Sequence, residues 1–257
     1  MDKWNQAERY IHITELIHEH KSVQIEKLAF DMGVSENTIR RDLTALAEQG
    51  ILTRTKGGAM VNHLDNESRP FSVRGRRNYP GKQHIAQRAV EMIEDGDTII
   101  IDSGTTTLEI ARRLVTRSHI TVVTNSLAVA DILSPAGDIT TILCGGIIHS
   151  ASRSLIGMTA EEFFRSTVKA DKCFLSAKAV SDEGIIYEQN MFEPPVKLAM
   201  IGASTTCILL ADMTKMGTSS LVPLGDFSPI HCLISDGTPS PAMYKHLSAH
   251  SVEIIRV

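Results

Sequence analysis

The pattern of hydrophobic and polar positions changes once along the chain. From residue 8 to about residue 60, apolar residues recur at the spacing of short amphipathic helices. From about residue 98 onward, apolar runs typical of buried strands alternate with amphipathic segments. Residues 62–82, between these parts, contain prolines, glycines and four arginines without a sustained apolar period. The pattern therefore predicts two domains, residues 1–61 and 83–257, joined by a basic linker over residues 62–82.

The first part of the chain is typical of a helix-turn-helix followed by a small hairpin. Helices are expected over Ala7–His20, from Val23 or Gln24 to Met32, and over Glu36–Gln49. Gly33 suits the left-handed residue that ends a helix, and Ser35 suits the N-cap that begins the next one. Such a short break joins two helices at a steep angle. Residues 51–61 alternate in polarity and turn at a Gly-Gly pair, which predicts a β-hairpin of the kind called a wing.

The third predicted helix is the candidate DNA-reading element. Ile39, Leu43 and Leu46 fall on one stripe, so the opposite stripe is polar and mostly neutral or basic. A helix of this size fits the major groove, where side chains contact base edges and flanking cations contact phosphates. The competing interpretation is that the double arginine only solvates a surface helix, and the turn, stripe and wing together favour DNA. The expected DNA contacts are Ser35, Asn37, Thr38, Arg40, Arg41, Thr44, Arg54 and Lys56, with Asn37, Thr38 and Arg41 as base readers.

Asp42 is expected to play a different part from its neighbours on this helix. It lies near the apolar stripe, and its negative charge would repel phosphate. We therefore expect it to orient a nearby arginine or to cap backbone donors.

Seven apolar runs in the second part predict strands. Near-continuous hydrophobic strands that alternate with helices indicate a Rossmann-like, mostly parallel α/β sheet covered on both faces. Ligands of such sheets bind at the carboxyl ends of the strands. The expected fold class is α/β, with an N-terminal winged helix-turn-helix domain and this larger domain. The strands are expected over Thr98–Asp102, Ile120–Thr124, Thr140–Cys144, Lys172–Ser176, Cys207–Ala211, Cys232–Ser235 and Val252–Val257.

Polar residues follow several of these strands and form a candidate ligand site. Residues 102–107, Asp-Ser-Gly-Thr-Thr-Thr, run directly into a predicted helix over Leu108–Leu114. A glycine-containing, hydroxyl-rich turn at a helix N-terminus offers N–H groups and a positive dipole end to phosphate, and the alternative is a simple capping run. Taken singly, each of the nearby cations is more often a solvated surface group than a ligand contact. The candidate ligand-binding residues are Asp102, Ser103, Gly104, Thr105, Thr106, Thr107, Thr124, Asn125, Ser126, Gly145, Gly146, Arg153, Lys178, Glu193, Lys197 and Lys215.

These motifs resemble those of the DeoR family of bacterial transcription regulators over nearly the whole chain. The N-terminal likeness lies in residues 34–43, Leu46, Gly50, Arg54 and residues 57–59. The C-terminal likeness lies in residues 102–106, 124–126, Gly145-Gly146 with Gly157, Glu193 with Val196-Lys197, and Asp212 with Thr214-Lys215. The resemblance implies a repressor of a carbohydrate catabolic operon that binds double-stranded operator DNA. It also implies a sensor domain that is similar in fold to ribose-5-phosphate isomerases and binds a phosphorylated sugar or similar small anion. We expect a homodimer or homotetramer.

Two positions depart from the pattern of that family. The family often has Asp-Gly where this chain has Lys178-Ala179, and Arg where it has His149. Exchanging an acid for a lysine inverts the local charge, so the ligand carries an extra anionic group or presents its hydroxyls differently; alternatively, Lys178 forms an internal ion pair. His149 is expected to be a structural or surface residue rather than a catalytic one.

Composition and charge exclude several other classes of protein. No apolar stretch approaches the roughly 20 residues of a membrane span, and the polar N-terminus does not resemble a secretory signal, so a cytoplasmic protein is expected. Net charge is −4, so DNA binding has to rest on local charge. The four cysteines are far apart and expected to be reduced core residues; no spacing suggests a metal site, and no cofactor is expected.

An enzyme is the alternative function. A sugar-phosphate isomerase-like enzyme with an accessory DNA-binding domain would need a carboxylate base, for which Glu193 or Asp102 can be nominated. Glu193 is followed by Pro194-Pro195, which suits the start of a helix, so capping or binding a ligand hydroxyl explains it equally well. We therefore expect a regulator without catalytic residues.

Overall fold

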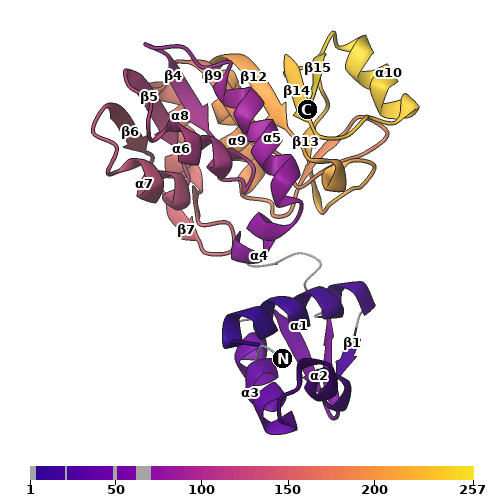
Figure 1. The fold of residues 1–257 in the computed structure, drawn as a ribbon. Helices are drawn as coiled ribbons and strands as arrows, with labels where there is room; N and C mark the ends of the chain where they lie inside the picture. Colours follow the sequence, from indigo (N-terminus) through magenta and orange to yellow (C-terminus); the bar gives the residue numbers. More distant parts are fainter. Residues whose placement is uncertain (1–3, 21, 49–50, 62–70) are drawn as a thin grey trace. The chain divides into compact units, whose positions relative to one another are not determined.

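The computed structural model describes residues 4–20, 22–48, 51–61 and 71–257. The chain divides into two compact units between Pro70 and Phe71 (Figure 1). Each unit is described by itself below. In the described part of the chain, none of the helices has the length and apolar character needed to cross a membrane.

The N-terminal unit is a three-helix fold with a small antiparallel sheet. Ile13, Ile17, Leu28, Ile39 and Leu43 form its buried core. The expected helices and wing are confirmed. Residues 22–24, which the sequence assigns in part to the start of a helix, instead form a strand that pairs with the wing, Ser22 opposite Met60. The elements are α1 (Gln6–His20), β1 (Ser22–Gln24), α2 (Ile25–Met32), α3 (Glu36–Glu48), β2 (Leu52–Thr55) and β3 (Gly58–Val61), with sheet order β1-β3-β2.

The second unit is built on a seven-stranded parallel sheet, as the sequence predicts. Its strand order is β15-β14-β12-β9-β4-β5-β6. Each of the seven apolar runs supplies one strand, with ends that differ from the expected ones by at most three residues. The strands are β4 (Thr98–Ile101), β5 (Ile120–Thr124), β6 (Ile139–Leu143), β9 (Ala170–Ser176), β12 (Ser204–Leu210), β14 (Cys232–Ser235) and β15 (Glu253–Arg256).

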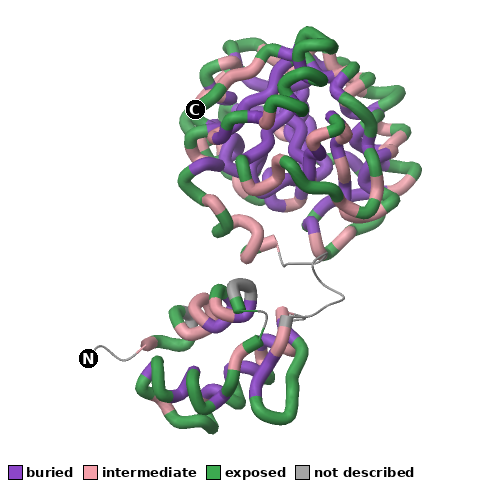
Figure 2. The backbone as a smooth tube through the Cα atoms, turned by 90° about the vertical axis from the view of Figure 1, so that its right-hand side faces the viewer, coloured by how far each residue is buried: buried purple, intermediate pink, exposed green. Residues whose placement is uncertain are grey.

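Helices cover both faces of this sheet (Figure 1). One face packs against Ile85 of α5 and Leu108 of α6, and the other packs against Phe164 of α8 and Met200 of α9. Figure 2 shows the buried residues concentrated in the interior of this unit. The helices are α5 (Tyr79–Val90), α6 (Thr107–Leu114), α7 (Leu127–Leu133), α8 (Met158–Thr167), α9 (Glu193–Gly202) and α10 (Pro241–Ala249). Cys144, Cys173, Cys207 and Cys232 are buried free thiols, as expected.

Several short elements were not expected from the sequence. Residues 71–82, assigned above to a linker, are largely helical and belong to the second unit, because Phe71 packs on its core and Lys82 is buried in it. The rest of that predicted linker, residues 62–70, lies outside the described residues. The further elements are α4 (Phe71–Arg76), β7 (Ile147–His149), β8 (Ser154–Ile156), β10 (Ala179–Val180), β11 (Ile186–Glu188), β13 (Val222–Gly225) and the 3₁₀ turn η1 (Met213–Lys215).

Candidate functional site

The turn before α3 has the local chemistry that the sequence indicates. Gly33 ends α2 in the left-handed conformation at φ 63°, where a side chain would be strained. The Ser35 hydroxyl accepts a hydrogen bond from the Thr38 N–H at 3.1 Å, which satisfies one of the free donors at the start of α3. These two residues fix where α2 ends and α3 begins.

The outward face of α3 is polar and exposed. Asn37, Arg40, Arg41 and Thr44 are all exposed, whereas Ile39, Leu43 and Leu46 are buried. The Arg41 side chain has no hydrogen bond or ion pair within the described residues. Arg40 is paired with Glu36 at 2.7 Å and contacts the Asn37 side chain at 3.3 Å. This face is therefore accessible to a DNA groove. Arg41 is the cation on it that has no side-chain partner within the described residues.

Arg54 adds a polar connection between the wing and α3, which also share a buried apolar core. Arg54 on β2 donates to the Thr44 hydroxyl at 2.5 Å and to the backbone carbonyl of Arg40 at 3.3 Å. The Thr44 hydroxyl in turn donates to the same carbonyl at 2.8 Å. Lys56, at the tip of the hairpin, is exposed. Arg54 and Thr44 thus fix the position of the wing on the helix, in addition to any contact with DNA.

Asp42 orients an arginine, as expected. Arg9 on α1 donates to both carboxylate oxygens of Asp42, at 2.7 and 3.2 Å, and also to the Trp4 carbonyl at 2.9 Å. Both charged side chains are largely buried. This two-pronged pair joins α1 to α3.

The loop between β4 and α6 presents unused hydrogen-bond donors. The backbone N–H groups of Thr105 and Thr106 meet no acceptor within the described residues. The buried Thr106 hydroxyl oxygen also has no partner there. Gly104 allows this conformation, because a Cβ atom at that position would lie 2.2 Å from the Ser176 hydroxyl. Free N–H groups at a helix N-terminus are suited to binding an anion.

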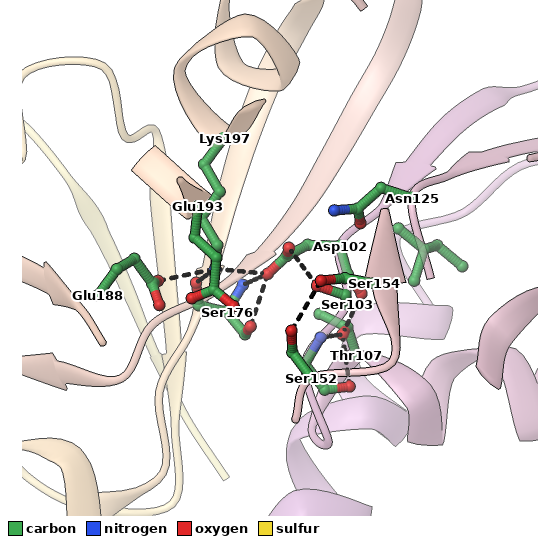
Figure 3. Close-up of polar contacts among 12 residues, drawn as sticks. Asp102, Ser103, Thr107, Asn125, Ser152, Ser154, Ser176, Glu188, Glu193 and Lys197 are labelled. Atoms are coloured by element: carbon green, nitrogen blue, oxygen red, sulfur yellow. Dashed lines mark hydrogen bonds and ion pairs between the residues drawn. The ribbon is translucent and has the colours of Figure 1, made fainter. Parts of the chain in front are cut away.

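Asp102 lies beneath this loop in a network of donors (Figure 3). Its Oδ2 atom accepts hydrogen bonds from the Ser176 N–H at 3.0 Å, the Ser176 hydroxyl at 2.6 Å and Lys197 Nζ at 2.8 Å. Burial acts to raise the pKa of Asp102, but Lys197 and Ser176 outweigh it and hold that pKa below its usual value. Asp102 is therefore a fully buried, ionised carboxylate.

Lys197 joins two strand ends to α9. Its Nζ atom lies 2.7 Å from Glu188 Oε1 and also donates to the Ser176 carbonyl at 2.7 Å. Burial would lower the pKa of Lys197, but the surrounding carboxylates, Asp102 first, raise it above its usual value. Burial raises the pKa of Glu188 to about 8, against the attraction of Lys197. The sequence singled out Lys197 but missed Glu188 and Ser176, whose role depends on β9 and β11 meeting α9.

The β7–β8 hairpin covers the other side of the site. The Asn125 side chain donates to the Leu155 carbonyl at 3.2 Å, while its buried Oδ1 atom has no partner within the described residues. Ser152 lies 2.7 Å from both Ser154 Oγ and His149 Nδ1. His149 lies 3.8 Å from Oε1 of the buried Glu193. These contacts join the hairpin to the N-terminus of α9.

Three cations lie on elements that border the same region. Arg74 of α4 donates to the Ala151 carbonyl at 3.0 Å and is attracted by Glu193, Glu188 and Asp102. Lys82 donates to the Arg74 carbonyl, and burial lowers its pKa to about 8. Burial also lowers the pKa of Lys215, against the attraction of Asp212. The sequence analysis did not predict Arg74 and Lys82 as site residues, because they lie in an arginine-rich stretch with the pattern of a linker.

Some of the residues expected to bind the ligand make contacts with other protein groups instead. Arg153 pairs with Asp131 on α7 at 2.6 Å at the surface, so its charge is not directed at the Asp102 network. Its assignment as a ligand cation stays a prediction. The hydroxyls of Thr107, Thr124 and Ser126 bond to nearby backbone groups. Gly145 and Gly146 pass close to α8, and Lys178 is half-buried beside β11. Ser103 lies beside Asp102, 3.5 Å from Oδ1.

Comparison with known proteins covers both units. A family model described as the DeoR C terminal sensor domain matches residues 77–237, and one described as the DeoR-like helix-turn-helix domain matches residues 9–64. The HTH-type transcriptional regulator GlpR of Haloferax volcanii is 32% identical over 97% of this chain and 97% of its own length. The glycerol-3-phosphate regulon repressor of Escherichia coli is 31% identical over 97% of this chain and 98% of its own.

Two further comparisons are with a repressor and with a solved structure. The HTH-type transcriptional repressor GlcR of Bacillus subtilis is 32% identical over 97% of this chain and 96% of its own length. A structure of ribose 5-phosphate isomerase A from Methanocaldococcus jannaschii is similar with a TM-score of 0.41 and 16% identity, over 54% of this chain and 55% of that one. This partial similarity gives no information about a reaction or a ligand of this chain.

Proposed function

This chain belongs to the DeoR family of DNA-binding transcriptional regulators, and from that premise we propose that it is a repressor whose operator affinity depends on a phosphorylated sugar or related small anion. Its target is an operon of carbohydrate catabolism. The relatives named above are regulators and repressors of transcription. Regulation of this kind takes place in the cytoplasm, where the operator is.

The DNA-reading part of the proposal rests on the exposed polar face of α3. Asn37, Thr38 and Arg41 contact base edges in the major groove, since they lie in the first turns of the helix after the Ser35 cap. Arg40 and Lys56 contact phosphates on either side. Arg54 aligns the wing, because its guanidinium rests on Thr44.

The observation that carries ligand binding is the set of unsatisfied polar groups at the start of α6 and just after β5. The N–H groups of Thr105 and Thr106, the Thr106 hydroxyl and the Asn125 Oδ1 atom have no partners in the described part of the chain. Buried polar groups are normally satisfied, so such a set suggests a missing guest. Phosphate oxygens accept from the N–H groups, and a sugar hydroxyl donates to Asn125. Lys82, Lys215 and Arg74 supply the neutralising charge.

The enzymatic alternative is weakened by the state of its candidate base. A general base must be free to accept a proton from a bound substrate. Asp102 is held ionised by three hydrogen bonds from Ser176 and Lys197, and its low pKa makes it a poor proton acceptor. Glu193 lies 3.8 Å from His149 Nδ1 and begins α9 ahead of two prolines. The same groups suit a binding site whose charges are fixed.

The experiment that tests the proposal separates DNA binding from ligand binding. Genomic fragments selected by the full chain serve as operators, and inorganic phosphate, glycerol 3-phosphate and hexose phosphates are screened as ligands by thermal shift. Arg41→Ala should weaken operator binding about 10- to 100-fold and leave the thermal shift intact. Thr105→Glu, or the nearly isosteric Thr106→Val, should reduce the thermal shift and leave operator binding intact. Consumption of the ligand, or equal loss of both activities in both variants, would contradict the proposal.

A further inference from the structure

The carboxylate of Asp236 connects two segments that are far apart in the sequence. Asp236 follows β14 at the carboxyl end of the sheet, where ligands of parallel sheets bind. Its Oδ2 atom accepts a hydrogen bond from the Asn78 side chain at 2.6 Å, and its Oδ1 atom accepts one from the Met213 N–H at 2.7 Å. Asn78 lies just before α5, which runs beside β14 (Figure 1), and Met213 begins η1. One side chain thus joins the starts of α5 and η1.

The backbone around Asp236 permits an unusually close approach. Asn78 has a left-handed conformation at φ 48°, which is uncommon for a residue other than glycine. Gly81 lies in the first turn of α5, where a Cβ atom would overlap the Asp236 carboxylate. A Cβ atom on Gly237 would likewise lie 2.7 Å from the Met213 Cβ atom. The two glycines therefore let α5 and η1 pack against Asp236 and its neighbour at a distance that larger residues would prevent.

Each of the joined segments carries a lysine of the candidate ligand site. Lys82 follows Gly81 in α5 and is buried, and Lys215 is the last residue of η1. Burial first, and then the charge of Lys215, lower the pKa of Lys82 to about 8. Asp212 attracts both lysines but holds neither segment in place by itself. Because like charges repel, the two ammonium groups will separate unless the segments that carry them are held together.

We propose that Asp236 is a positioning residue of the ligand site, which keeps Lys82 and Lys215 together by tying α5 to η1. The two ammonium groups are then in place before an anion binds, so that little side-chain ordering is needed at the moment of binding. Asp236 acts without touching the anion, because both of its carboxylate oxygens already accept from N–H donors. This inference rests on the proposed function, since it takes an anion to be what the two lysines bind.

Two variants and a control separate positioning from ordinary stabilisation. Asp236→Ala removes both hydrogen bonds. Asn78→Asp combined with Asp236→Asn exchanges the two side chains, and both hydrogen bonds can form again, because the new amide accepts from the Met213 N–H and donates to the new carboxylate. Aspartate also tolerates the left-handed conformation at position 78. Asp226→Ala is the control, because this exposed aspartate also accepts from a backbone N–H, that of Ser228.

Sulfate is the probe for binding by the full chain, because it keeps both of its charges at every pH of the titration. In the unchanged chain, its affinity at constant ionic strength should fall as pH rises through about 8, where Lys82 loses its proton. Asp236→Ala should weaken sulfate binding about 10- to 100-fold at pH 7, since two lysines then have to be ordered by the anion. The exchanged pair should recover most of this loss, and Asp226→Ala should bind sulfate as the unchanged chain does.

A second measurement needs no ligand. NMR titration of the lysine Cε signals, with one signal assigned by its loss in Lys82→Met, gives the pKa of Lys82. In Asp236→Ala this pKa should rise from about 8 toward 10.5, because Lys215 moves away and water enters, and the exchanged pair should return it to about 8. A role of Asp236 in stability alone would leave it unchanged. The other charged groups that act on Lys82, which these variants retain, are Asp212, Arg74 and Arg77.

The outcomes distinguish this inference from the proposed function. Sulfate binding by Asp236→Ala as tight as that of the unchanged chain, or a Lys82 pKa that stays near 8 in this variant, would overturn the positioning role. A loss that the exchanged pair does not recover would do the same, with circular dichroism verifying that each variant is folded. An unchanged chain that binds neither sulfate nor a sugar phosphate would contradict the proposed function and the positioning role together, whereas differences among the variants bear on Asp236 alone.

Discussion

At the scale of single residues, burial decides more than residue type. Lys197 and Asp102 both have the chemistry of ligand-binding groups, yet each is committed to the other and to Ser176. The sequence could predict that Asp102 and Lys197 lie at strand and helix ends of one site, because the strand pattern is strong. It could not predict that they pair, because they are 95 positions apart in the sequence and only the fold determines the distance between them.

The free-energy cost of burying the charged side chain of Lys82 can be measured. Burial lowers its pKa from 10.5 to about 8, so the unfolded chain binds the proton more tightly than the folded one. The folded state therefore bears the full penalty below about pH 8 and is relieved of it as pH rises from about 8 to 10.5. A shift of this size corresponds to about 3 kcal/mol at neutral pH. The penalty is tolerable if the charge is needed for an anionic ligand.

Lys82→Met should accordingly stabilise the second unit at pH 7 and lose that advantage at high pH. We expect its free energy of unfolding to exceed that of the unchanged chain by about 2–3 kcal/mol at pH 7 and to match it near pH 10.5. Urea unfolding followed by circular dichroism at several pH values measures the difference. Lys245→Met, at an exposed lysine of α10, serves as the control. A difference that stays constant with pH would contradict the assigned burial cost.

At the scale of elements, the strands of the parallel sheet were predictable and the short antiparallel ones were not. A buried parallel strand is apolar on both faces, so runs such as Thr98–Ile101 stand out in the sequence. β1 is three residues long and exists because Val23 lies opposite Ala59 on the wing. β10 and β11 depend similarly on pairing across a turn. When a short strand forms only because it pairs with another strand, its own sequence gives little indication that it is a strand.

The Arg9–Asp42 pair supports a prediction at this scale, because it holds α1 against α3. Removing one partner of a buried pair leaves an uncompensated charge, so Asp42→Ala should destabilise the N-terminal unit by about 3–5 kcal/mol. Replacing both, with Arg9→Met and Asp42→Leu, should restore most of that loss. Trp4 is the only tryptophan and lies in this unit, where it stacks on His12, so its fluorescence reports urea unfolding of this unit alone.

The double replacement also distinguishes positioning from stability. If the pair fixes the rotation of α3, the doubly changed chain should recover its stability but discriminate less well between operator and random DNA, because the base readers are no longer held in register. Competition binding at one salt concentration measures that ratio. Full recovery of discrimination together with stability would show that the pair only stabilises the unit.

At the scale of the whole molecule, ligand and operator can communicate only if each changes the affinity for the other. If a sugar phosphate found by thermal shift changes the operator dissociation constant by some factor, the operator must change the dissociation constant of that sugar phosphate by the same factor. We expect a factor of about 5 to 150, typical of coupling between distant sites. Titrating the ligand calorimetrically with and without saturating operator, and the operator by fluorescence anisotropy with and without saturating ligand, gives the two factors independently. The equality holds whether the ligand releases or strengthens DNA binding, so the sign of regulation does not affect the test. Unequal factors would reveal a further equilibrium, and self-association of the chain is the one to examine first, because unequal subunit concentrations in the two titrations would separate the factors.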